Sequence, residues 1–593
     1  MIDRNQTIGF GLIFALTAAY FLYMSNTEPQ QPVAQKAATT ISTPDSVKNT
    51  AAVAKPIIAP ISGIGTQGEN KAVVLENSDV KITFQSQGAV VTDVLVKKYF
   101  THDKKPLHLI TPTNNQFALK GLNRDNNTID LYSLYYQVVQ TKNSVQFFVS
   151  DSAGNKLTHT YTLPETGYTL NYEIGGPALK SWFNIASPME LSWDNSVDQA
   201  EYDVEQSSIK TTVNYFEEED GFDQLSEASK EEENETISKP LKWISLKQKF
   251  FNIGIISKNT FQKGVFKTTP NANPGKIKDL SASVTIPAEN IQKDTLAFTF
   301  FFGPNLYQTC KAVGSDYEKN VYLGWPIING INRFIVIPVF DFLQTYISNY
   351  GVIIIILVLL IKLLLLPLSY KSYISMAKMK VMKPELDAIK AENGDDMQKT
   401  QAAQMKLYQQ VGINPLSGCI PVVLQMPILL AMFNFFPASF ELRQEAFLWA
   451  PDLSTYDAPI LLGFTIPFYG SHISIFTVLM TISTLAYTYI NNQVSTAATG
   501  PMKTISYAMP VVFMFVLNSF PAGLSFYYLM SNVVTIAQQL IIRQFVDEGS
   551  IKAKLDENRT KIASGQGGKK SKWMQRVEDA MKAQEEIKKA KKK

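Results

Sequence analysis

An apolar stretch interrupted by a single lysine sets the strongest limit on what this chain can fold into. Residues 351–368 read GVIIIILVLLIKLLLLPL. At about 1.5 Å per helical residue, a stretch of this length can cross the hydrocarbon core of a bilayer. A lysine at the bilayer centre costs roughly 2.5–3.5 kcal/mol, so Lys362 marks a candidate functional site inside a membrane-spanning helix.

Two interpretations of Lys362 remain open from this stretch alone. The other apolar stretches contain no Asp, Glu or His, so the charge has no intramembrane partner within the chain. Such a charge suggests a wet cavity that presents a cation to a passing molecule. Alternatively, Lys362 lies only about 9 Å along the helix from Leu368, and its side chain can lean toward the interface.

Further apolar stretches predict a polytopic helical membrane protein with six spans. The other candidate spans are residues 7–24, 420–437, 473–490, 504–518 and 523–542. The first of these is either a cleaved signal peptide or a signal anchor. No small-x-small site directly follows it, which favours an uncleaved anchor over residues 1–26. Residues 27–70 are rich in Pro, Ala, Thr, Gln and Ser, which predicts a flexible linker.

Residues 71–304 alternate between apolar and polar positions, which predicts a large antiparallel β-sandwich. The clearest strand patterns start at residues 80, 89, 131, 144, 169, 281 and 295. An acidic segment, residues 217–235, interrupts the pattern and is expected to be a solvated loop. The region shows no nucleophile elbow, phosphate loop or metal-ligand spacing.

Two amphipathic regions flank the lysine-bearing span. Within the connector 305–350, Tyr322, Trp325 and Arg333 suit a helix that lies at the membrane surface, although an ordinary packed helix has the same pattern. Residues 370–416 predict a helical hairpin with a turn near Gly394. Its methionines, Met376, Met379 and Met382, are either an adaptable binding surface or packing between the two helices.

Lysine placement predicts the topology. Residues 370–416 contain seven lysines, whereas residues 438–472 contain Arg443 as their only basic Lys or Arg residue. The tail 543–593 is rich in lysine and ends KKAKKK. By the positive-inside rule, the hairpin, the tail and both termini are cytoplasmic, while the β-domain and residues 438–472 lie outside.

Neutral polar side chains gather on one face of the last span. Tyr528, Ser531, Asn532, Thr535, Gln538 and Gln539 recur there at helical spacing. Gln425, Asn434 and Asn518 are further polar residues in or beside other spans. Such groups either form hydrogen bonds between helices or line a hydrated groove, and their number on one face favours the groove.

Several function classes fit the composition poorly. The four histidines are scattered and the two cysteines, Cys310 and Cys419, lie far apart, which argues against a catalytic zinc centre or a disulfide framework. The spans lack the carboxylate relay and the inverted repeat typical of an ion-coupled transporter. No nucleophile–base pair indicates an enzyme, and no cofactor is expected. The remaining interpretation is transient contact with polar, acidic peptide.

Four long motifs resemble the YidC/Oxa/Alb family of membrane protein insertases in its long Gram-negative form. They read IKLLLLPLSYKSYISMAKMKVMKPELDAIK from residue 361, GINPLSGCIPVVLQMPILLAMF from 412, ELRQEAFLWAPDLS from 441 and FPAGLSFYYLMSNVVTIAQQ from 520. The resemblance covers essentially the whole chain. It implies a periplasmic β-supersandwich resembling sugar-mutarotase folds, and a five-helix insertase core over residues 351–542 with a groove open to cytoplasm and lipid.

The resemblance also implies roles for particular residues. The groove charge of the family is usually arginine, and Lys362 occupies the matching position, where a point charge replaces a planar fork. Tyr528 matches the family's aromatic groove position. Nascent membrane proteins, the Sec translocon and membrane lipids are implied partners. The basic tail suits ribosomal RNA or anionic lipid, and DNA is not expected.

The expected function is therefore a membrane protein insertase and chaperone of the bacterial inner membrane. Lys362 attracts acidic groups on the incoming segment, and hydrophobic burial of its apolar part drives transfer into lipid. Two alternatives are a polytopic solute transporter and a membrane-anchored periplasmic sugar-binding protein.

Overall fold

The chain forms two compact units, residues 1–322 and 323–593. The computed structural model describes residues 64–293, 295–394, 397–413, 420–494 and 501–564. The predicted first span, most of the linker 27–70 and the end of the tail lie outside these described residues.

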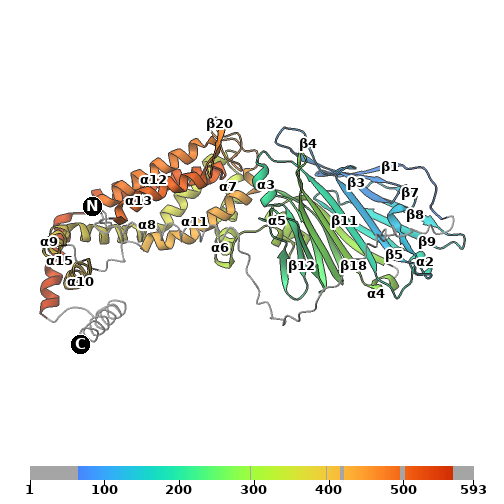
Figure 1. Ribbon diagram of the computed structural model, residues 1–593, viewed down its shortest axis with the longest axis horizontal. Coiled ribbons are helices and arrows are strands. Elements are labelled where there is room, and N and C mark those ends of the chain that lie inside the picture. Colours follow the sequence, from blue (N-terminus) through green and yellow to red (C-terminus); the bar gives the residue numbers. More distant parts are fainter. Residues whose placement is uncertain (1–63, 294, 395–396, 414–419, 495–500, 565–593) are drawn as a thin grey trace, which may run out of the picture. The chain divides into compact units, whose positions relative to one another are not determined.

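The first unit is built from three antiparallel sheets (Figure 1). The nine-stranded sheet runs β13 (Gly221–Gln224), β12 (Thr212–Glu217), β15 (Leu241–Lys247), β16 (Phe251–Phe261), β19 (Thr295–Pro304), β10 (Thr169–Gly175), β9 (Lys156–Thr162), β8 (Ser144–Ser150) and β7 (Gln137–Gln140). The six-stranded sheet runs β14 (Glu233–Ile237), β17 (Lys263–Pro270), β18 (Lys276–Ile286), β11 (Met189–Asp198), β5 (Asn115–Leu122) and β6 (Thr128–Asp130). The smallest runs β1 (Ala72–Glu76), β2 (Val80–Gln85), β3 (Val90–Phe100) and β4 (Pro106–Ile110).

Short helices connect these strands. They are η1 (Leu131–Ser133), α2 (Ala178–Trp182), α3 (Val204–Ile209), α4 (Ala288–Gln292), α5 (Tyr307–Val313) and η2 (Tyr317–Asn320).

Alternating side chains fill the interior between the sheets. In β11, every second residue from Met189 to Val197 is buried while its neighbours face outward. Trp193 from this strand stacks on Phe117 with ring centres 4.9 Å apart, and its ring edge meets Phe300 of the nine-stranded sheet. Aromatic residues from both large sheets thus form the core, and the predicted antiparallel β-sandwich is confirmed.

Two predictions for this unit were wrong in detail. Residues 131–140 form a short 3₁₀ turn, η1, followed by β7, because the Asp130 carboxylate accepts a hydrogen bond from the Tyr132 backbone and ends the preceding strand. The acidic segment 217–235 is not a solvated loop, since it contributes β13 and β14. Glu227 within it is nearly buried and pairs with Lys210 and Lys247, so the lysines compensate its charge.

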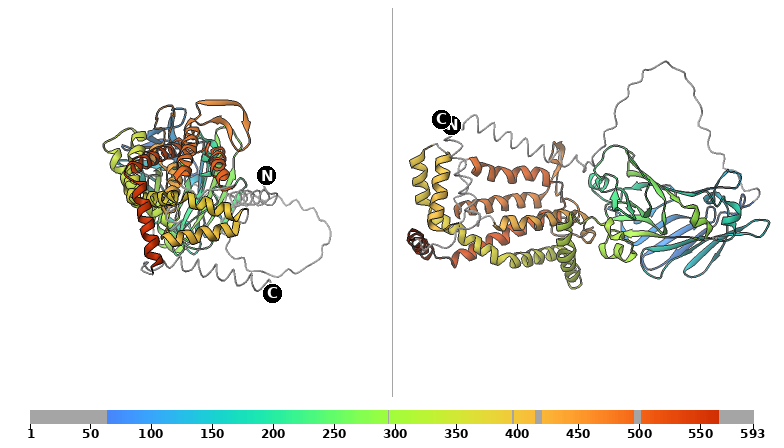
Figure 2. Two further views of the ribbon diagram at one scale, coloured as in Figure 1. Left: turned by 90° about the vertical axis from the view of Figure 1, so that its left-hand side faces the viewer. Right: turned by 90° about the horizontal axis from the view of Figure 1, so that it is seen from below.

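The second unit consists mainly of long helices (Figure 2). They are α6 (Pro326–Ile331), the π-helical turn η3 (Asn332–Val336), α7 (Ile337–Gln344), α8 (Tyr350–Val381), α9 (Lys383–Asn393), α10 (Met397–Val411), α11 (Ile420–Ala438), α12 (Ile475–Val494), α13 (Pro501–Leu517), α14 (Ala522–Gln544) and α15 (Glu548–Ala563). Between α11 and α12, the 3₁₀ turn η5 (Phe440–Leu442) precedes a two-stranded hairpin of β20 (Ile460–Ile466) and β21 (Gly470–Ile473).

Helix α8 extends well beyond the stretch predicted to span the membrane. It begins after Asn349, whose side chain accepts a hydrogen bond from the Val352 backbone, and it continues past Leu368 to Val381. Pro367 lies inside the helix and removes one backbone donor, yet does not end it. The reason is packing: beyond the proline, buried side chains of α8 join a cluster with α9, α10 and α15. The predicted hairpin is therefore formed by α9 and α10, and its first methionines belong to α8.

By length and composition, two described helices are long and apolar enough to cross a membrane, Pro326–Gln344 and Tyr350–Val381. Two shorter apolar helices are Gln425–Ala438 and Thr504–Leu517. The first of the long pair, the continuous helical segment formed by α6, η3 and α7, lies within the expected amphipathic connector 305–350. It exposes Phe334 and Phe342, at 72% and 62%.

Candidate functional site

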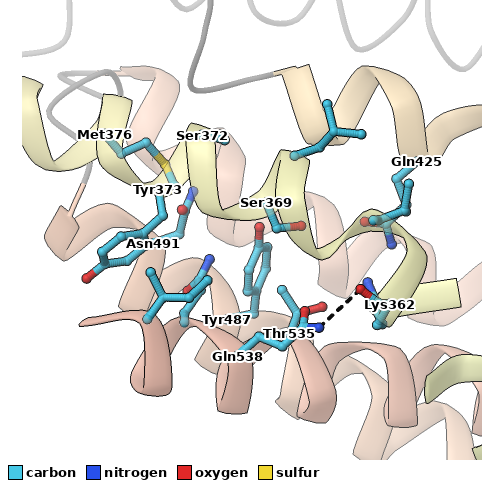
Figure 3. Close-up of a pocket in the computed structure, with 14 residues that line it drawn as sticks. Lys362, Ser369, Ser372, Tyr373, Met376, Gln425, Tyr487, Asn491, Thr535 and Gln538 are labelled. Carbon is cyan, nitrogen blue, oxygen red and sulfur yellow. Dashed lines mark hydrogen bonds between the residues drawn. The ribbon is translucent and has the colours of Figure 1, made fainter. Parts of the chain in front are cut away.

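A polar pocket opens between α8, α11, α12 and α14 (Figure 3). Its lining is Lys362, Leu365, Leu368, Ser369, Ser372, Tyr373, Met376, Gln425, Tyr487, Asn491, Thr535, Gln538, Gln539 and Ile542. The space open to water molecules is about 80 Å³. Because one water needs roughly 10–15 Å³ on this measure, the pocket has room for several.

Lys362 lies at one end of the pocket with only 5% of its surface exposed. Within the described residues, no ion pair reaches its ammonium group. Gln538 of α14 donates its side-chain N–H to the backbone carbonyl of Lys362 at 3.2 Å, which ties the two helices together beside the charge. A buried cation without a counter-ion is costly unless water or an incoming anion solvates it.

Neutral polar side chains surround the lysine rather than acids. Figure 3 shows Gln425 on one side of Lys362, with Thr535 and Gln538 on the other. Thr535 donates its hydroxyl to the Ser531 carbonyl of its own helix at 2.6 Å. The side-chain oxygen Oε1 of Gln539, also in the lining, is buried and accepts no hydrogen bond from any described residue. This oxygen is thus available to water or to a donor on a bound peptide.

The polar surface continues into a neighbouring cavity. Tyr373 and Gln539 line both spaces, and the second also includes Lys380, Arg543 and Glu548. Lys380 pairs with Glu548 at 2.6 Å, which joins α8 to the start of α15. Lys380 and Arg543 therefore continue the basic lining beyond Lys362, toward the end of α8 that is followed by α9 and α10.

The structure brings Lys362, Gln425, Thr535, Gln538 and Met376 together in one lining. Other predicted groove residues lie elsewhere. Asn532 donates to the hydroxyls of Ser483 and Thr484 on α12, at 3.0 and 2.8 Å, and so links two helices. This is the interhelical hydrogen bonding that was the alternative to a groove.

Four further predicted residues have contacts of their own outside the pocket. Asn434 donates to the Leu430 carbonyl of its own helix at 2.8 Å. Tyr528 packs edge-on against Phe433, with ring centres 5.8 Å apart. Ser531 is buried, and its carbonyl accepts the Thr535 hydroxyl. Asn518 is fully buried at the base of the β20–β21 hairpin.

The hairpin methionines are packing residues in this structure. Met379 and Met382 are 3% and 4% exposed and belong to a cluster that includes Leu386, Leu407 and Leu555. Met376 belongs to the same cluster and also borders the pocket.

Five polar lining residues were absent from the predicted set, namely Ser369, Ser372, Tyr373, Tyr487 and Asn491, whereas Gln539 belongs to the polar face predicted for the last span. A signal for some of them was present in the sequence. The end of α12 reads YTYINNQ from residue 487, which is unusually polar for a span. Ser369 and Ser372 lie on the continuation of α8 at i, i+3 spacing, which places them on one face of the helix. They were missed because the span was predicted to end at Leu368.

The chain matches two family models. Residues 342–549 match a model described as 60Kd inner membrane protein, and residues 72–340 match one described as YidC periplasmic domain. Together they cover both compact units.

Two relatives named membrane protein insertase YidC match along nearly their whole length. That of Cytophaga hutchinsonii is 52% identical over 99% of this chain and 98% of its own. That of Amoebophilus asiaticus is 44% identical over 98% of this chain and 99% of its own. A solved structure of an active YidC insertase with the first transmembrane domain resolved is 18% identical over 80% of this chain and 93% of its own, with a TM-score of 0.31.

Proposed function

The chain belongs to the YidC family of membrane protein insertases, and we propose that it inserts nascent membrane proteins by way of the pocket around Lys362. Its β-sandwich is the periplasmic domain of the family, and its helical unit is the inner membrane part. The single observation that carries the proposal is the nearly buried Lys362, surrounded by neutral polar side chains and without an acidic partner among the described residues.

The proposed membrane arrangement has six spans and places both termini in the cytoplasm. The spans are residues 1–26 and helices α8, α11, α12, α13 and α14, of which the last five form the insertase core over residues 351–542. Residues 71–304 are the periplasmic domain and residues 305–350 the connector, with α6 and α7 at the membrane surface. The lysine-rich hairpin 370–416 and tail 543–593 support this orientation, because basic loops stay cytoplasmic.

In the proposed mechanism, the hydrophilic end of the substrate enters the pocket from the cytoplasmic side. A carboxylate about 4 Å from the Lys362 ammonium gains roughly 4 kcal/mol at an effective dielectric near 20, before desolvation. Lys362 carries this attraction without a permanent complex, because its flexible point charge does not hold a carboxylate in two parallel hydrogen bonds as arginine does. The neutral groups and pocket waters solvate the remaining polar atoms.

The apolar part of the substrate then moves into lipid. Burial of apolar surface supplies about 25 cal/mol per Å², which offsets the cost of carrying the polar end across. The scheme uses no nucleotide and no cofactor and forms no covalent intermediate, so the role is not enzymatic.

We extend the proposal to three partners besides the substrate. The Sec translocon is expected to share substrates with this chain. The basic tail 543–593 is expected to bind anionic lipid or ribosomal RNA, since both present phosphates to lysine. The exposed lysines of the cytoplasmic hairpin make the first contact with the nascent chain, because the hairpin methionines are buried.

The test uses purified protein in liposomes and a single-span substrate with an acidic N-terminal tail. Protease protection of the tail is measured for the wild type, Lys362→Arg and Lys362→Ala. Protection should persist with arginine and fall about tenfold with alanine, which corresponds to about 1.4 kcal/mol. Lys81→Ala is the control for the loss of a lysine, because Lys81 is an exposed lysine of β2 in the β-domain.

Equal protection by all Lys362 variants would contradict the role of the lysine and leave insertion intact. Protection no better than with empty liposomes would contradict autonomous insertion itself.

A further inference from the structure

The β20–β21 hairpin between α11 and α12 exposes apolar side chains at the end of the helices. Figure 2 shows this hairpin projecting from the helical unit. Leu461, Phe464 and Phe468 are 71%, 65% and 91% exposed. The segment from residue 458 to 502 contains no Asp, Glu, Lys or Arg, so no charge disfavours burial of the hairpin in an apolar environment.

The turn of the hairpin holds an aromatic residue where glycine is preferred. The Tyr469 backbone N–H donates to the Ile466 carbonyl at 3.1 Å, so Ile466, Pro467, Phe468 and Tyr469 form a β-turn. Phe468 occupies its third position with φ of 65°. Proline at the second position and positive φ at the third are the pattern of a type II turn, in which glycine or asparagine is usual at the third. A bulky residue with positive φ is strained, and such a conformation persists only where the surrounding structure holds it.

The base of the hairpin is held rigidly while its tip is not covered. Asn518 donates from Nδ2 to the carbonyls of Tyr469 and His472, both at 2.8 Å, and its Oδ1 accepts from the Ser474 backbone at 2.9 Å. His472 donates from Nε2 to the Asn518 carbonyl at 2.9 Å. The fixed base sets the direction in which Phe464 and Phe468 project.

A two-stranded hairpin with exposed apolar side chains is not expected to be stable when surrounded by water. Two isolated strands are marginally stable there, and this pair has apolar side chains on both faces. Among the described residues no third strand pairs with it, so its outer edges carry backbone N–H and C=O groups without ladder partners, which excludes it from the hydrocarbon core. The boundary between headgroups and acyl chains satisfies both conditions, since the backbone stays hydrated while the aromatic side chains reach lipid.

We propose that the β20–β21 hairpin is an interfacial anchor that inserts Phe464 and Phe468 into the periplasmic leaflet of the bilayer. This inference rests on the proposed topology, which places residues 438–472 outside. Lipid is the occupant because the hairpin leads directly into α12, so its base lies where that helix enters the membrane. The anchor would hold α12 and α13 at a fixed depth, because Asn518, which directly follows α13, is bonded to the hairpin.

The experiment places single cysteines in the full chain, with Cys310→Ala and Cys419→Ser removing the native thiols. An environment-sensitive fluorophore is attached at Phe468→Cys or, separately, at Phe464→Cys, and the protein is reconstituted in phosphatidylcholine–phosphatidylglycerol vesicles. Val139→Cys is the matched control, because Val139 is an exposed apolar residue of β7, 55% exposed, in the β-domain. Leu364→Cys, 69% exposed on α8, is the positive control for lipid contact.

Spin-labelled lipid should quench the probes at 464 and 468 at least about twofold more than the probe at 139, with blue-shifted emission. Emission and iodide quenching at 464 and 468 like those at 139, with 364 in lipid, would overturn the anchor and leave the insertase topology standing. Probes shielded from both iodide and lipid would also overturn it, because a protein surface would then cover the hairpin. An aqueous probe at 364 would overturn the anchor together with the proposed topology. Substrate insertion measured in the same vesicles separates this result from the loss of insertase function.

Discussion

Gln538 donates its side-chain N–H to the backbone carbonyl of Lys362 across 3.2 Å, so this hydrogen bond connects α14 to α8 at the residue that carries the charge of the pocket. The contact joins the polar face of α14 to the apolar helix that carries Lys362. It fixes the depth and rotation at which the lysine side chain leaves α8. The position of the charge therefore depends on a neutral side chain 176 residues away in the sequence.

Replacing Gln538 with methionine should remove this hydrogen bond between α14 and α8 without changing any charge. Methionine keeps the length of the side chain and removes the donor, so about 0.5–1.5 kcal/mol of stability should be lost. Insertion of a substrate with an acidic tail should fall severalfold, whereas insertion of one with an uncharged tail should change less. The measurements are thermal unfolding in detergent and protease protection in liposomes. Leu540→Met on the same helix, a half-exposed position outside the pocket around Lys362, is the control and should change neither.

Glu227→Gln should lower the stability of the β-domain near neutral pH. Burial raises the pKa of Glu227, but attraction and hydrogen bonds from Lys247 and Lys210 outweigh this and lower the pKa to about 2. As pH falls, the Glu227 carboxylate is protonated first in the unfolded chain, near its ordinary pKa of 4.5, and in the folded chain only near pH 2. The ion pairs of Glu227 therefore contribute their full stability above pH 4.5, and this contribution is lost as the pH falls toward 2. The shift corresponds to roughly 3 kcal/mol at most.

Unfolding of the full-length protein in detergent, followed from pH 7 to pH 3, tests this expectation. The variant should be less stable at pH 7, partly because Lys247 loses its buried partner, and the gap to the wild type should narrow below about pH 4.5. Glu232→Gln is the control, since Glu232 pairs with Lys267 at the surface and should matter little at any pH. A gap independent of pH would contradict the assigned pairing.

The sequence predicted a β-domain followed by a helical membrane unit because strand alternation and apolar stretches are patterns of residues close together in the chain. Alternation in strands such as β11, and the apolar stretch around Lys362, follow from which faces are buried. Pairings between distant residues are not local and escaped prediction. Glu227 looked solvated among other acids, and only the folded sheet brings Lys210 and Lys247 to it.

The candidate site was predicted in part for a similar reason. Helical spacing placed Thr535 and Gln538 on the same face of α14 as Asn532. Spacing alone did not show that α12 covers Asn532 with Ser483 and Thr484 and leaves the others open to the pocket. Which part of a polar stripe meets a neighbouring helix depends on packing, which a single sequence does not display.

Asn518→Leu should destabilise the helical unit strongly, although Asn518 lies outside the pocket. The change removes two donors and one acceptor from a fully buried position, which leaves the Tyr469 and His472 carbonyls and the Ser474 N–H without their side-chain partner. The expected loss is about 3 kcal/mol, at roughly 1 kcal/mol for each bond. Asn434→Leu is matched to it, since the one side-chain hydrogen bond of Asn434 to a described residue lies within its own helix, and it should cost less than about 0.5 kcal/mol. Thermal unfolding compares the two, and similar losses would contradict the role of Asn518 at the hairpin base.

Lys362→Glu tests whether the pocket selects substrates by charge. Carboxylate and ammonium differ in sign but both need solvation, so the polar lining of Gln425, Thr535 and Gln538 can hold either. The variant should repel acidic tails, and their insertion should fall about tenfold. Insertion of tails in which lysine replaces the acids should rise about tenfold. Protease protection of paired substrates that differ only in tail charge measures this exchange. Loss of insertion for both tails would indicate a structural need for the lysine, and unchanged preference would show that another group selects the charge.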